Sequence, residues 1–72
     1  MDSKVQGYVK EYALTKKEGK VLDHLLEGLN AKEIASTESI TYESARWYIK
    51  QIYQKVGVSS QVKLMRKLLV ES

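Results

Sequence analysis

A tryptophan and two cations share the polar side of a helix-length segment, residues 41–56 (TYESARWYIKQIYQKV). At about 100° per residue around a helix, the apolar residues of this segment form a stripe on one side. Arg46, Trp47 and Lys50 fall on the other side and are directed to solvent. An exposed tryptophan beside two cations is typical of a surface that contacts an anionic partner with flat faces. Double-stranded DNA fits this chemistry best.

Each of these three side chains has a predicted DNA contact and an alternative. Arg46 can donate two hydrogen bonds to guanine O6 and N7, and Lys50 can contact a base edge or a phosphate. Trp47 can pack on a thymine methyl group or on a sugar. Alternatively, Trp47 anchors a protein partner, or it packs against tyrosines of the N-terminal segment.

Positive charge is concentrated in the second half of the chain. Residues 1–40 hold six basic and seven acidic side chains, whereas residues 41–67 hold six basic side chains and one acidic one. The net charge of the whole chain is +3. The asymmetry favours an anionic partner for the second half.

Length and composition exclude several classes of protein. The 72 residues suffice for one small domain, and the absence of proline predicts an all-α fold. No cysteine is present, and His24 is the only histidine, so we expect no disulfide and no metal site. We find no nucleophile–base pair, no signal peptide and no apolar run long enough to span a membrane. We therefore expect a cytoplasmic, nucleoid-associated protein that is not an enzyme and needs no cofactor.

Capping residues predict four helices joined by short turns. The predicted N-caps are Thr15, Asn30, Thr41 and Ser59 or Ser60, with Glu18 and Glu33 completing capping boxes and Gly28 and Gly57 as left-handed stops. The short helix at about 31–37, its turn and the two-faced helix at 41–56 make a helix-turn-helix. In that motif the second helix lies in the major groove of DNA.

The N-terminal segment, residues 1–13, is predicted to be a leader helix or the stub of a linker. Val5, Tyr8, Val9 and Tyr12 have the spacing of one apolar helix face. Residues 14–72 are expected to form the helix-turn-helix domain itself.

The last predicted helix, to about Val70, carries two apolar stripes, and one of them is left for a partner. Val62, Met65 and Leu69 form one stripe, and Leu64 and Leu68 lie nearly opposite. A second copy of the chain is the expected partner, because paired DNA half-sites need a two-fold axis. The alternative is that the N-terminal segment covers this stripe.

Three ordered motifs resemble a known family. Residues 14–22 (LTKKEGKVL), 28–35 (GLNAKEIA) and 52–60 (IYQKVGVSS) are similar to the LuxR-type (GerE-like) DNA-binding domain of bacterial transcription regulators. The resemblance covers about residues 14–68. It implies a four-helix bundle with a central helix-turn-helix, and sequence-specific binding of double-stranded DNA as a homodimer through the fourth helix. RNA polymerase and an absent N-terminal regulatory domain are further partners that it suggests.

The resemblance also assigns positions to the DNA contacts. The family's base-reading sites fall on Arg46, Trp47 and Lys50. Its phosphate contacts fall on Lys32, Thr41, Ser44 and Lys55.

The chain departs from the family pattern at several of its positions. Glu38 replaces a leucine in the turn, which predicts a looser or more exposed turn, and Gln61 replaces an arginine. Trp47 replaces a small apolar residue, so we expect an unusual target sequence. Two alternatives remain. One is a sigma-factor promoter-binding region, although residues Lys55–Val58 at the end of the third helix argue against it. The other is a protein-interaction module with weak or lost DNA binding.

Overall fold

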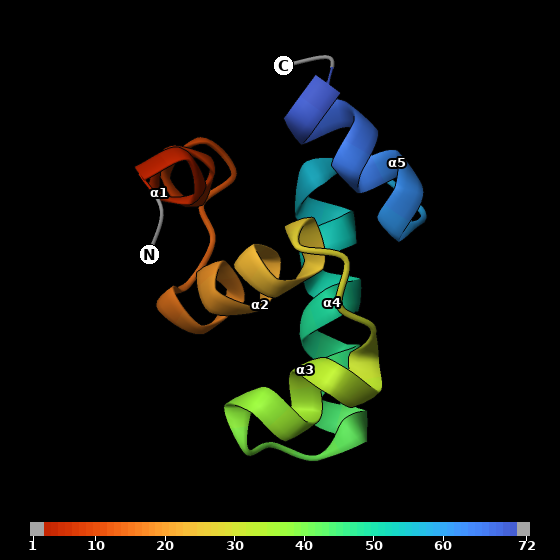
Figure 1. Ribbon diagram of the computed structural model, residues 1–72. Coiled ribbons are helices and arrows are strands. Elements are labelled where there is room, and N and C mark those ends of the chain that lie inside the picture. The colour runs from red at the N-terminus through yellow and green to blue at the C-terminus, as the bar shows by residue number, and fades with distance from the viewer. Residues whose placement is uncertain (1–2, 71–72) are drawn as a thin grey trace.

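The computed structural model describes residues 3–70, and this part of the chain is helical apart from short turns. Its elements are α1 (Ser3–Glu11), α2 (Lys16–Leu26), α3 (Ala31–Glu38), α4 (Tyr42–Val56), α5 (Gln61–Met65) and a π-helical turn, η1 (Arg66–Val70), that continues α5. Figure 1 shows α4 running through the domain, with α3 beside its first half and α5 above its end. The all-α prediction is confirmed.

No helix among residues 3–70 is both long enough and apolar enough to cross a membrane.

The predicted capping residues begin the helices. Thr15 starts α2 in a capping box: its hydroxyl accepts from the Glu18 amide at 3.1 Å, and the Glu18 carboxylate accepts from the Thr15 amide at 2.8 Å. Asn30 and Glu33 repeat this arrangement at α3, and Thr41 caps α4. Because these bonds span three residues, local sequence suffices to predict them.

Helix α1 packs into the same core as the helix-turn-helix. Val5 and Tyr8 are buried, and the Tyr8 hydroxyl donates a hydrogen bond to the carbonyl of Leu68, in η1. Of the two expectations for residues 1–13, the helical one therefore describes residues 3–11. Residues 1, 2, 71 and 72 of the expected segments lie outside the described part.

The core is centred on the apolar stripe of α4. Ala45, Ile52 and Val56 are at most 3% exposed. They meet buried side chains of α2 and α3, among them Leu22 and Ile34, which are fully buried. Burial of each large aliphatic side chain contributes about 1.5–3 kcal/mol, so this stripe fixes which side of α4 faces inward.

A buried carboxylate ties the start of α2 to the end of α4. Glu18 is 3% exposed, and Lys55 Nζ donates to its Oε1 at 2.7 Å. Burial acts to raise the pKa of Glu18, but hydrogen bonds from the Lys55 ammonium and from Thr15 outweigh it and hold the pKa below its ordinary value of 4.5. Glu18 is therefore charged in the folded protein at neutral pH.

We expect Glu18→Gln to lower the free energy of unfolding by about 1–3 kcal/mol at neutral pH, because the charge-assisted bonds are lost. The unfolded state binds the proton more tightly, so this stabilisation is present above a pH of about 4.5 and is lost as the pH falls through the native pKa. Urea unfolding of Glu18→Gln followed by circular dichroism should then show a weaker pH dependence than that of the wild type.

The matched control is Glu33→Gln, which alters the exposed capping box of α3 and removes no ion pair that the structure shows. Its pH profile should follow the wild type. Identical profiles for Glu18→Gln and wild type would contradict the assigned role of Glu18.

Candidate nucleic-acid interface

The turn between α3 and α4 aims one side of α4 outward. Ser39 adopts a left-handed conformation at φ 56°, and the Ile40 amide donates to the Ala35 carbonyl at 3.0 Å, which closes α3. Helices α3 and α4 pack against each other, and Ala45 on α4 is fully buried. A side chain of one carbon permits close approach of neighbouring helices. The opposite side of α4 is left free of the core.

The three predicted base-reading residues lie together on this outer side. Arg46, Trp47 and Lys50 are all exposed, and 56% of the surface of Trp47 is accessible to solvent. They line one open groove, which is bounded across from them by Asn30 and Ala31 at the start of α3. The structure therefore joins cations, an indole and a helix N-terminus on one surface.

Neighbouring aromatic rings support two of these side chains. The Arg46 guanidinium carbon lies 5.9 Å from the centroid of the Tyr42 ring, a cation–π contact one helical turn away. The Trp47 and Tyr48 rings meet edge to face, with centroids 5.2 Å apart and planes at 76°. Sequence reasoning missed Tyr42, although its spacing from Arg46 is the signal for such a pair.

Tyr53 also lines the groove and was missed by sequence reasoning. Burial raises the pKa of its phenol, so it keeps its proton and can donate a hydrogen bond at neutral pH.

The predicted phosphate contacts divide into two groups. Lys32 is exposed in the first turn of α3. At the start of α4 the Thr41 hydroxyl accepts from the Ser44 amide at 3.0 Å and donates to the Ser44 hydroxyl at 2.9 Å. These residues lie at helix N-termini, where amides and the helix dipole favour anions. Lys55 does not belong with them.

Lys55, the remaining predicted phosphate contact, is engaged inside the domain. Its ammonium donates to Glu18 and, at 3.4 Å, to the carbonyl of Ala13. Its ammonium therefore binds the start of α2 in this structure, and its contact with phosphate stays a prediction. A pair separated by 37 residues leaves no local pattern in the sequence.

Two of the five residues predicted for the dimer interface lie in the core. Leu64 and Leu68 are 0% and 1% exposed and belong to the core, so they cannot contact a second folded copy. Val62 is 65% exposed, Leu69 is 41% exposed, and Met65 is half-buried. The stripe of Val62, Met65 and Leu69 is thus the one left uncovered. On the opposite side, α5 packs against α2, and Tyr8 of α1 donates to the carbonyl of Leu68.

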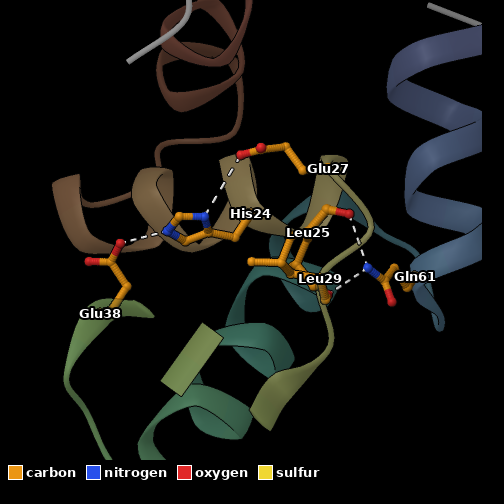
Figure 2. A network of polar contacts seen from close by, with 6 residues as sticks. All are labelled: His24, Leu25, Glu27, Leu29, Glu38 and Gln61. Atoms are coloured by element: carbon orange, nitrogen blue, oxygen red, sulfur yellow. Dashed lines mark hydrogen bonds and ion pairs between the residues drawn. The ribbon is translucent and has the colours of Figure 1, made fainter. Parts of the chain in front are cut away.

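Two departures from the family pattern have internal partners (Figure 2). His24 Nε2 lies 2.6 Å from Glu38 Oε2, and Glu38 is half-buried. Gln61 Nε2 donates to the carbonyls of Leu25 and Leu29 at 3.0 and 2.9 Å. The expectation of a loosened turn at Glu38 was wrong, because His24 on α2 holds the carboxylate. Gln61 satisfies carbonyls at and just beyond the end of α2.

His24 also lies near Glu27, at 3.8 Å from Nδ1 to Oε1. Within residues 3–70, no group of three or more histidine, cysteine or acidic side chains is placed to hold a metal ion.

A helix-turn-helix with an exposed basic and aromatic second helix defines a class of DNA-binding domain. Residues 12–68 match the GerE family, described as bacterial regulatory proteins of the luxR family, over well more than half of the chain. The chain therefore belongs to the LuxR family and is a helix-turn-helix DNA-binding domain of bacterial transcription regulators, a family without enzymatic activity. No curated protein and no solved structure matches it significantly.

Proposed function

We propose that α4 enters the major groove of double-stranded DNA and that Arg46, Trp47 and Lys50 contact base edges there. The observation that supports this proposal is that all three side chains are exposed on one side of α4, whereas the other side of this helix is buried in the core. The major groove of B-DNA admits an α-helix, and arginine or lysine is the usual partner of guanine O6 and N7. The cation–π contact with Tyr42 restricts Arg46 before it binds.

Phosphate contacts supply the affinity in this proposal. Asn30 and Ala31 at the start of α3 line one side of the groove, and the exposed Lys32 follows them in the first turn of α3. Thr41 and Ser44 lie at the start of α4. Neutralised phosphates release counterions, which makes binding depend steeply on salt. Such contacts orient the helix on the duplex but carry no sequence information.

The alternative of a protein-interaction module loses much of its support. Three features of the sequence favour it: the carboxylates of Glu38 and Glu43, and the arginine missing at Gln61. Of these residues, Glu38 and Gln61 have partners inside the domain. Glu43 remains as an exposed carboxylate on the outer side of α4. A single carboxylate among cations is compatible with DNA, because carboxylates accept hydrogen bonds from cytosine N4.

We further propose that two copies bind adjacent half-sites through Val62, Met65 and Leu69. Val62 and Leu69 are exposed and Met65 is half-buried, so the core leaves this stripe at least partly uncovered. Within a longer regulator, an N-terminal regulatory domain and RNA polymerase are further proposed partners. The bacterial chromosome, in the cytoplasm, is the proposed place of action.

Base and phosphate contacts are distinguishable by mutation. On a duplex obtained by selection from a random library, we expect Arg46→Ala to weaken the binding free energy by about 1–3 kcal/mol. The affinity for unrelated duplexes should change little. Lys32→Ala should weaken all duplexes about equally and lower the slope of log K against log salt by about one. Fluorescence anisotropy at several salt concentrations measures both.

The controls are Lys10→Ala on α1, which should bind as the wild type does, and Lys55→Ala, which should lower stability without changing the salt slope. Unchanged specific binding in both Arg46→Ala and Lys50→Ala would remove α4 from the interface.

For the dimer, we expect the Val62→Glu variant to bind a single half-site with wild-type affinity. Its affinity for paired half-sites should fall about tenfold or more, because the two copies no longer bind as a linked pair. Gln6→Glu, with the same charge change at an exposed position of α1, is the control. Sedimentation on paired-site DNA reports the stoichiometry. Equal wild-type affinity for single and paired half-sites would contradict this interface.

A further inference from the structure

We infer that Trp47 recognises the C5-methyl group of a thymine in the base pair next to a guanine bound by Arg46. The inference rests on the proposed entry of α4 into the major groove.

The indole is presented as a fixed apolar surface. Trp47 keeps 56% of its surface exposed, yet its ring lies edge to face with the ring of the half-buried Tyr48. Tyr48 packs against the core, so it limits the rotation of the indole. A side chain that is already restrained loses less conformational entropy on binding.

The surroundings of Trp47 distinguish DNA from a protein partner. Lys50 and Glu43 lie one turn away on the same exposed side, and Arg46 is adjacent. The centres of protein interfaces are depleted of charged residues, whereas base edges in the major groove offer many polar groups to them. The face therefore has the composition of a base-reading surface with one apolar element.

Only one unmodified base matches that apolar element. In the major groove, guanine, adenine and cytosine present hydrogen-bonding groups, whereas thymine adds a methyl group. An indole that displaced water from the polar edges alone would leave donors and acceptors unpaired. Packing on the methyl group avoids this cost.

Arg46 locates the guanine. It is the residue before Trp47, so the two side chains leave α4 about 100° apart. We expect them to reach neighbouring base pairs. The Tyr42 ring, 5.9 Å from the guanidinium carbon, restricts its position. The expected target thus contains adjacent guanine and methyl-bearing pyrimidine contacts in each half-site.

Deoxyuridine tests the methyl group alone, because it differs from thymidine only by that group. We would select a duplex from a random library with the full 72-residue chain and replace its thymidines one at a time by deoxyuridine. At one position per half-site, beside the guanine sensitive to Arg46→Ala, wild-type affinity should fall about fourfold, as expected for one buried carbon.

The Trp47→Ala variant should bind the thymidine and deoxyuridine duplexes with equal affinity. The Trp47→Phe variant should retain part of the wild-type difference in affinity between the two duplexes. Replacing that thymidine by cytidine should weaken wild-type binding, and 5-methylcytidine should restore part of the loss. Circular dichroism should show that both variants are folded, because Trp47 is exposed and its replacement leaves the core intact.

Specific binding that no deoxyuridine substitution weakens would overturn this inference and leave the proposed function intact. The same holds if Trp47→Ala keeps the full methyl effect. Failure to select any preferred duplex would overturn both.

Discussion

Burial of one side of α4 is the constraint on which the rest of the domain depends. Ala45, Ile52 and Val56 are held against α2 and α3, and this apolar contact sets the rotation of the helix about its own axis. A rotation by one residue, about 100°, would expose Ile52 and drive charged groups into the core. The outward position of Trp47 is therefore a consequence of core packing.

The features that could be predicted from the sequence are local ones. Capping boxes at Thr15 and Asn30 and the two-faced helix of residues 42–56 depend on neighbours within one or two turns. The docking of α1 could not be predicted with certainty, because Tyr8 bonds to Leu68, 60 residues away. The ion pair of Lys55 with Glu18 could not be predicted either, because the two residues are 37 positions apart.

The departures from the family pattern differ in their consequences. Glu38 bonds to His24, and Gln61 satisfies two carbonyls at the end of α2, so these substitutions are accommodated inside the domain. Trp47 has no such function in the core, since it is exposed. A change in scaffold residues can thus be compensated internally, whereas a change on the outer side of α4 acts on the partner. This contrast supports the proposal that Trp47 sets the choice of target.

The most direct test of this account is a nuclear magnetic resonance titration of the ¹⁵N-labelled chain with duplex DNA at low salt. The indole N–H signal of Trp47 can be assigned directly and reports on contacts of this side chain, because the chain has one tryptophan. The account predicts that this signal and the amides of residues 30–32 and 41–50 shift together, while those of α1 stay in place. Shifts centred on α1, or an indole signal that does not move at saturation, would contradict it.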